Sequence, residues 1–144
     1  MITSELQRNK LLKNIKLIVT DIDGTLLNDN GEVGSESKEL VKELMKLNVM
    51  VSFATGMLHS AVTEIAKELS LNGYIISLDG ALIKNYTSDK TIYDSYLSTN
   101  QVKKAITLSE KNLVNIVLCR ASAIYYTENN SVIHLCRVNT ALLI

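Results

Sequence analysis

The sequence predicts an α/β fold in which a Rossmann-like, doubly wound parallel sheet is followed by a smaller α+β unit. Short apolar runs alternate with stretches whose apolar residues recur at helical spacing, in the order strand, helix, strand, helix, strand. That order implies parallel strands joined by right-handed crossovers. Beyond Gly80 the pattern changes to short strand-like runs. The 144 residues are 47% hydrophobic, which is enough apolar material for a core.

The predicted sheet unit contains three strands and two helices. We expect, in chain order, a strand at residues 16–20, a helix from Ser35 through Leu47, a strand at 49–54, a helix over 58–69 ended by Asn72 and Gly73, and a strand at 74–78. The first helix is amphipathic, and Glu36 in its first turn favours the helix dipole. The strands are short apolar runs, which is typical of strands buried on both faces.

A second unit is predicted to begin after this sheet. Residues 81–85 and 91–95 resemble paired strands around a turn, and a helix through Val102 to Ser109 precedes two antiparallel strands at 114–119 and 123–127. We therefore divide the chain into an amino-terminal tail (1–14), the sheet unit (15–84) and the α+β unit (85–144). The division depends on the change of pattern alone, because the chain has no proline and no low-complexity linker.

Composition argues against several classes of partner. Fifteen basic and fifteen acidic side chains give no net charge, so we expect neither nucleic acid nor a membrane surface as a partner. No stretch is apolar enough to span a bilayer, and the start of the chain is too polar for a signal peptide, so we expect a cytoplasmic protein. Cys119 and Cys136 form no CxxC pair, which favours buried, reduced thiols over a disulfide or a zinc site.

Polar residues follow each of the three predicted parallel strands. They are Asp21 and Asp23 after the first strand, Thr55 and Gly56 after the second, and Asp79 and Gly80 after the third. Ligands of open α/β sheets bind beyond the carboxyl ends of the strands, where loops and helix amino termini converge. We therefore expect these residues to be neighbours in the fold.

The chemistry of the first of these loops points to a metal and a phosphate. Asp21 and Asp23 concentrate negative charge, and hard cations such as Mg²⁺ bind oxygen ligands of this kind. Gly24 permits close approach of the backbone, and Thr25 adds a hydroxyl that can fix the loop. A phosphate would then meet backbone N–H groups.

The acidic pair has two simpler interpretations, a turn former and a calcium loop. Acidic residues after a strand are often turn formers, and a bare DxD would favour that structural role. Asp21, Asp23 and Glu32 also match three ligand positions of an EF-hand calcium loop. That match fails because Leu26 stands where the loop needs glycine, and because a strand precedes it instead of a helix.

The residues around the acidic pair favour a catalytic role over a turn or a calcium loop. The segment LIVTDIDGTLL resembles the first motif of the haloacid dehalogenase superfamily, VSFATG resembles its second, and SLDGAL resembles a signature of its Cof-type sugar-phosphate phosphatase branch. The resemblance runs from about Ile15 into the second unit. It implies that the sheet unit is the first half of the superfamily's core and that the second unit is the start of an α+β cap.

The resemblance also implies roles for individual residues. Asp21 would be the nucleophile that becomes a transient aspartyl phosphate, and Asp23 would be the general acid and base. Thr55 would hold a phosphoryl oxygen, and Mg²⁺ would be bound by Asp21 and Asp23. The remaining substrate or phosphate contacts would come from Gly24, Thr25, Gly56, Asp79 and Gly80. The substrate would be a small phosphorylated metabolite.

The sequence departs from the family's pattern in several places. It has no later GDxxND motif and no lysine at the expected place, while Met57 and Asp79 replace the usual arginine and asparagine. The apolar run at residues 140–144 suggests a truncated chain. We therefore expect weak or no phosphatase activity from this polypeptide alone, and possible self-association through an unpaired sheet edge.

Two functional hypotheses follow. The leading one is a phosphate-monoester hydrolase present as an incomplete chain. The competing one is a binding module: a pseudo-enzyme or fragment that binds Mg²⁺ or phosphate, or that pairs with a partner supplying the missing half.

Overall fold

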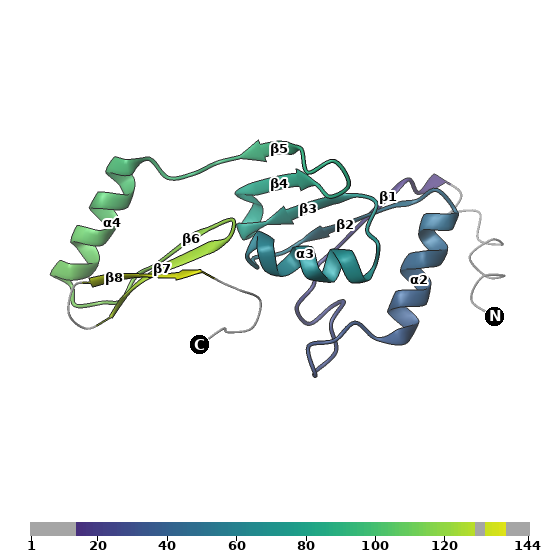
Figure 1. The fold of residues 1–144 in the computed structure, drawn as a ribbon, viewed down its shortest axis with the longest axis horizontal. Coiled ribbons are helices and arrows are strands. Elements are labelled where there is room, and N and C mark those ends of the chain that lie inside the picture. The colour runs from purple at the N-terminus through teal and green to yellow at the C-terminus, as the bar shows by residue number, and fades with distance from the viewer. Residues whose placement is uncertain (1–13, 129–131, 138–144) are drawn as a thin grey trace.

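A five-stranded sheet with the order β1-β2-β3-β4-β5 forms the larger part of the fold (Figure 1). The computed structural model describes residues 14–128 and 132–137. The elements of this part are β1 (Leu17–Thr20), α2 (Ser35–Lys46), β2 (Met50–Ala54), α3 (His59–Glu68), β3 (Tyr74–Ser77), β4 (Leu82–Asn85) and β5 (Thr91–Asp94). Strands β1, β2 and β3 are parallel, whereas β4 and β5 are antiparallel. The predicted α/β, Rossmann-like fold is confirmed.

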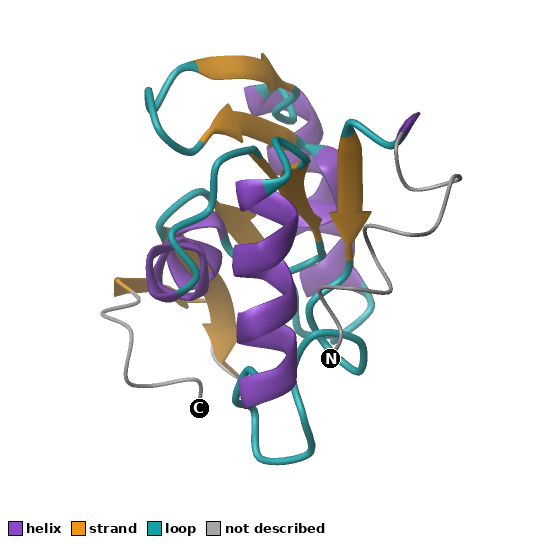
Figure 2. Cartoon of the chain, turned by 90° about the vertical axis from the view of Figure 1, so that its right-hand side faces the viewer, coloured by secondary structure: helices purple, strands orange, loops and turns teal. Residues whose placement is uncertain are grey.

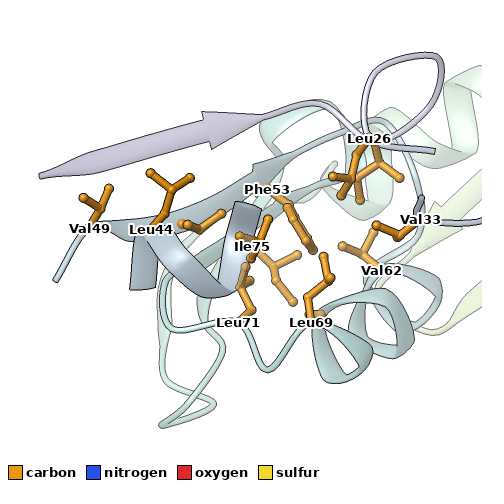
Figure 3. Close-up of a cluster of buried hydrophobic side chains, with 13 residues drawn as sticks. Leu26, Val33, Leu44, Val49, Phe53, Val62, Leu69, Leu71 and Ile75 are labelled. Atoms are coloured by element: carbon orange, nitrogen blue, oxygen red, sulfur yellow. The ribbon is translucent and has the colours of Figure 1, made fainter. Parts of the chain in front are cut away.

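Helices α2 and α3 pack on the same face of this sheet. Strands β1, β2 and β3 are neighbours in chain order, so two crossovers of the same hand place both helices on one side. Figure 2 shows α2 in front of the strands, and Figure 3 shows the buried side chains gathered between the strands and the helices. Phe53 and Val62, from β2 and α3, are both 0% exposed. This single apolar layer is the core that holds the strand ends in place.

The opposite face of the sheet is open at β1. Leu17 and Val19 pair in register with Met50 and Ser52, and each remains 48% exposed. Among the described residues, β1 has β2 as its one strand neighbour. The predicted unpaired edge at β1 is therefore present in the described part of the chain.

The end of α3 differs from the prediction. The helix ends at Glu68, and Ser70 adopts a φ of 54°, which stops the helical path before Asn72 and Gly73. The side chain of Asn72 instead accepts a hydrogen bond from Val51 N–H at 2.9 Å. At Gly73 a Cβ atom would lie 2.2 Å from the Val51 carbonyl oxygen. These two residues therefore serve the close packing of the chain on β2, and they do not cap the helix.

The β4–β5 hairpin belongs to the same sheet as β3. Residue pairs such as Ile76 with Ile83 and Ile83 with Tyr93 join it to the parallel strands. The division predicted between residues 84 and 85 therefore falls inside β4 and does not separate two sheets. The change of pattern near Asn85 marks a switch from parallel to antiparallel pairing, which needs only a short turn.

A helix and a separate three-stranded sheet follow the hairpin. They are α4 (Thr99–Lys111), β6 (Val117–Arg120), β7 (Ala123–Glu128) and β8 (Val132–Arg137). Ser98 and Gln101 form a capping box at the start of α4. The strands are antiparallel, as expected, but β8 was not predicted. This unit meets the larger sheet unit where Ser60 N–H donates to the Ala121 carbonyl at 3.1 Å.

Several predictions lie at the limits of the described residues. Nearly all of the predicted tail (1–14) and the apolar run at 140–144 lie outside them. Cys119, which was expected to be buried, is exposed on β6, a strand at the edge of the described three-stranded sheet. No helix in the described ranges is long and apolar enough to cross a membrane.

Candidate active site at the carboxyl edge of the sheet

The predicted site residues leave the sheet at one edge. Thr20 pairs with Phe53, so Asp21 and Thr55 both emerge just beyond this register. Thr55 N–H donates to the Ile76 carbonyl at 3.0 Å, and Asp79 N–H donates to the Thr55 carbonyl at 3.3 Å. The three strand ends are therefore joined into a continuous rim, with the Thr55 loop between the other two.

The loop after β1 is organised around a buried isoleucine. Ile22 is 0% exposed, whereas Asp21 and Asp23 on either side of it are exposed. The Ile22 carbonyl accepts hydrogen bonds from Leu26 and Leu27 N–H, both at 3.0 Å. Burial of this one side chain thus turns its two acidic neighbours outward.

The same loop presents backbone donors. Asp21 Oδ1 accepts from Ile22 N–H at 2.7 Å, which leaves Oδ2 of the carboxylate without a partner in the described structure. Gly24 has a φ of +69°, a conformation that favours glycine. Within residues 14–128 and 132–137, no acceptor is bound to the N–H groups of Asp23 and Gly24. Two free N–H groups beside a carboxylate can bind phosphoryl oxygens.

The acidic pair suits a magnesium ion but does not enclose one. Mg²⁺ keeps several waters and is commonly held by one or two carboxylates. Asp21 and Asp23 supply such carboxylates, and both are exposed to water. No group of three or more His, Cys, Asp or Glu side chains is placed to hold a metal in the described chain. The residues present therefore fit an open, partly hydrated site.

Thr55 presents a hydroxyl whose proton is available. The residue is 8% exposed, and its Oγ1 accepts a hydrogen bond from Met57 N–H at 3.2 Å. Because the oxygen is used as an acceptor, the hydroxyl proton can be donated to a ligand. The burial of Thr55 and its contact with Met57 restrict the direction of that donation.

Asp79 lies against the Thr55 loop in a constrained turn. Leu78 and Asp79 each have a φ of 54°, and Gly80 follows with a φ of +92°. A Cβ atom at Gly56 would lie 2.8 Å from Asp79 Oδ1, so the glycine makes room for this carboxylate. Among the described residues, no ion pair includes Asp21, Asp23 or Asp79. The rim is therefore acidic, without a basic side chain paired to it.

His59 is a feature that the sequence did not reveal. Its place at the start of a helix suggests a solvated side chain, but it is half-buried, and its Nδ1 lies 3.1 Å from Ser77 Oγ. Ser77 is 0% exposed, and its hydroxyl also lies 3.4 Å from the Leu82 carbonyl; the tautomer of the imidazole decides whether His59 or Ser77 donates in their contact. The contact depends on the packing of α3 against β3, so no local pattern signals it.

Burial and charge lower the pKa of His59. Desolvation is the larger cause, and the Lys84 ammonium, which is ion-paired with Asp89, adds repulsion, while the Asp89 carboxylate partly opposes it. A depressed histidine pKa means that the unfolded chain binds the proton more readily than the folded chain. The stability due to this histidine is therefore present above its ordinary pKa of 6.5 and decreases as the pH falls towards the lower folded value.

We expect His59→Asn to flatten the dependence of stability on pH. Asparagine can still donate to Ser77 but does not titrate, so the loss of stability on acidification from pH 7.5 to pH 5.5 should be smaller than in the wild type. The measurement is urea unfolding of both proteins at the two pH values. Equal losses of the free energy of unfolding would contradict this assignment, since His134 is common to both proteins.

Comparison with known proteins identifies the family to which the sequence is similar. A family profile described as haloacid dehalogenase-like hydrolase matches residues 18–140. A Bacillus subtilis 5-amino-6-(5-phospho-D-ribitylamino)uracil phosphatase is 36% identical over 70 residues, which cover 49% of this chain and 28% of that protein. An HMP-PP phosphatase of Serratia proteamaculans is 35% identical over 68 residues, which cover 47% of this chain and 25% of that protein.

Solved structures show the same architecture. A haloacid dehalogenase-like hydrolase from Bacteroides thetaiotaomicron superimposes with a TM-score of 0.70 at 27% identity, covering 77% of this chain and 43% of that one. The matched segments amount to less than half the length of each of these three relatives. The similarity therefore concerns part of each relative.

Proposed function

We propose that this chain, which belongs to the haloacid dehalogenase-like hydrolase family, acts in the magnesium-dependent hydrolysis of small phosphate monoesters. The observation that carries the proposal is the parallel register of β1 and β2, which brings the Asp21 carboxylate and the Thr55 hydroxyl to one edge of the sheet. The phosphatase names of the relatives support the reaction type and a small phosphorylated substrate.

In the proposed reaction Asp21 is the nucleophile. Its free carboxylate oxygen attacks phosphorus, and the bond between phosphorus and the ester oxygen breaks. Asp23 donates a proton to the departing alkoxide, so an alcohol leaves and an aspartyl phosphate remains. Asp23 then removes a proton from water, which attacks the phosphorus, releases inorganic phosphate and restores Asp21.

The surrounding groups hold the phosphoryl oxygens. The Thr55 hydroxyl and the N–H groups of Asp23 and Gly24 are the proposed donors, because each has a proton without an acceptor in the described structure. Further proposed contacts to phosphate or substrate come from Thr25, Gly56, Asp79 and Gly80. The loop conformations at Gly24 and Gly80 keep the backbone accessible.

We propose Mg²⁺ as the cofactor, which would be held by the Asp21 carboxylate and the Asp23 backbone carbonyl with water completing its shell, so that the Asp23 carboxyl group stays available for proton transfer. When bound, the ion would neutralise part of the charge that otherwise keeps the anionic nucleophile and the anionic ester apart. The rim offers no paired basic side chain to share this task. With no GDxxND motif in the sequence, we expect the activity of this chain alone to be low or absent.

The proposal is tested by phosphate release from p-nitrophenyl phosphate, with Mg²⁺ and after its removal by EDTA. Release that needs Mg²⁺ would support a hydrolase. Binding of Mg²⁺ or phosphate without any release would favour the competing binding module, which the phosphatase names of the relatives do not favour. A chain that neither binds nor hydrolyses would contradict both hypotheses.

We also propose that the α+β unit is a cap over the site. Its β6–β7 turn contacts the amino terminus of α3 through the bond between Ser60 N–H and the Ala121 carbonyl. Close by, the Arg120 guanidinium lies 5.8 Å from the ring centroid of Tyr96, a residue of the segment between β5 and α4. The contact at Ser60 supports the proposal, because α3 follows the Thr55 loop directly in the chain.

Self-association through β1 is a further proposal, and it makes a prediction. An edge strand with exposed apolar side chains favours pairing with a second chain, and a charged residue there opposes it. We expect Val19→Lys to lower the average mass measured by light scattering at high protein concentration. Leu113→Lys is the matched control, because Leu113 is 94% exposed and lies outside the sheets. An equal effect of both changes, or none, would contradict a role for β1.

A further inference from the structure

Asp79 carries a charge that the proposed reaction does not use. Its carboxylate lies on the Thr55–Gly56 loop, and a side chain at Gly56 would collide with it. The carboxylate has no ion-pair partner among the described residues. A phosphoryl group bound by Thr55 would therefore meet this fixed negative charge, which disfavours any ester that brings further negative charge.

The position of Asp79 along the rim decides which part of the ester it meets. The sheet order β1-β2-β3 places Asp79 on the side of Thr55 that faces away from Asp21. Asp79 is also tied to that loop through its N–H bond to the Thr55 carbonyl at 3.3 Å. The Asp79 carboxylate lies beside Gly56, where a Cβ atom would be 2.8 Å from its Oδ1, so a substituent of an ester bound at Thr55 can extend towards it.

The Thr55 hydroxyl beside the Asp79 carboxylate is available to bind a ligand. The Thr55 side chain is more than nine-tenths buried, with 8% exposed, and its hydroxyl proton has no acceptor in the described part of the chain. The backbone of Asp79 is in the left-handed region, with a φ of 54°. Aspartate and asparagine tolerate that conformation better than most residues. The charge of this side chain can therefore be removed by a change to asparagine without altering the loop.

We propose that Asp79 determines substrate specificity by selecting phosphate monoesters with a cationic group, such as a primary ammonium, near the phosphate. The proposal rests on the proposed function, because it assumes that the ester binds at Asp21 and Thr55. An ammonium group would pair with the Asp79 carboxylate, while a carboxylate at the same place would be repelled. Asp79 is exposed, so solvent and salt reduce the effect.

The test compares three esters that share a two-carbon group: phosphoethanolamine, ethyl phosphate and 2-phosphoglycolate. Dissociation constants are measured by NMR titration of the full chain in Mg²⁺ at low salt. We expect the wild type to bind phosphoethanolamine more tightly than 2-phosphoglycolate, and Asp79→Asn to shrink that ratio by about three- to tenfold. Glu64→Gln, which removes a charge from an exposed position on α3, should leave the ratio unchanged.

The outcomes separate this proposal from the proposed function. If all three esters bind and the ratio is the same in the wild type and in Asp79→Asn, the role of Asp79 is rejected while phosphate binding stands. Binding of all three esters by Asp79→Asn alone would also reject the role of Asp79, because the wild type would then fail to bind the ammonium ester that this carboxylate is proposed to select. If no ester binds to either protein, although both are folded by circular dichroism, the site itself is rejected and the specificity with it.

Discussion

Any magnesium-dependent release of phosphate from p-nitrophenyl phosphate by this chain, which we expect to be low, should fall to the background rate when Asp21 is replaced with Asn. The amide keeps the shape of the side chain and can still accept the bond from Ile22 N–H, which measures 2.7 Å in the structure. It lacks the anionic oxygen that attacks phosphorus, and loss of a nucleophile commonly lowers kcat by about 10³-fold or more. Intact-protein mass spectrometry should show a phosphorylated species only for the wild type.

Asp29→Asn is the matched control for this change. Asp29 is an exposed carboxylate in the turn that follows the same loop, so its replacement removes one nearby charge without touching the nucleophile. Its activity and phosphorylation should equal those of the wild type. Undiminished activity of Asp21→Asn, with an unchanged circular dichroism spectrum, would exclude Asp21 as the nucleophile.

Replacing Phe53 with Ala is expected to lower the free energy of unfolding by about 3–5 kcal/mol, the usual cost of removing a large buried aromatic side chain. Phe53 is 0% exposed on β2, the strand between β1 and β3, and belongs to the apolar cluster that α2 and α3 share. Domains of this size are stable by only about 5–15 kcal/mol. The variant should therefore be largely or partly unfolded, as urea titration followed by circular dichroism would show.

Leu113→Ala provides the contrast for the core substitution. Leu113 is 94% exposed, so its truncation removes almost no buried surface and should change the free energy of unfolding by less than about 0.5 kcal/mol. A similar loss of stability in both variants would show that the layer between the sheet and the two helices is not the main core.

The sequence was most informative where a short local pattern decides the structure. The buried positions of α2 and α3, Val41, Leu44, Val62 and Ala66, fall within the stripes that the apolar spacing predicts, whereas Leu40 and Leu47 at the margin of the α2 stripe are exposed. The polar residues after β1, β2 and β3 meet at one rim, because parallel strands end at the same edge. Neither result needed knowledge of a distant contact.

Sequence reasoning failed where a distant contact overrides the local pattern. Asn72 and Gly73 look like a helix stop, but their place is decided by the close approach of the chain to Val51. The hairpin after Gly80 looks like a new unit, but β4 pairs with β3. His59 looks solvated, but it is held by Ser77 across the packing of α3 on the sheet.

By itself the sequence determined the alternation of strands and helices, the acidic pair after the first strand and the hydroxyl after the second. These follow from periodicity and from the chemistry of side chains near one another in the chain. Only the tertiary structure decided that α2 and α3 share one face, that β4 and β5 join the same sheet and that the Asp79 carboxylate lies against Gly56. Such contacts depend on how strands pair and helices pack, and these interactions join residues far apart in the chain.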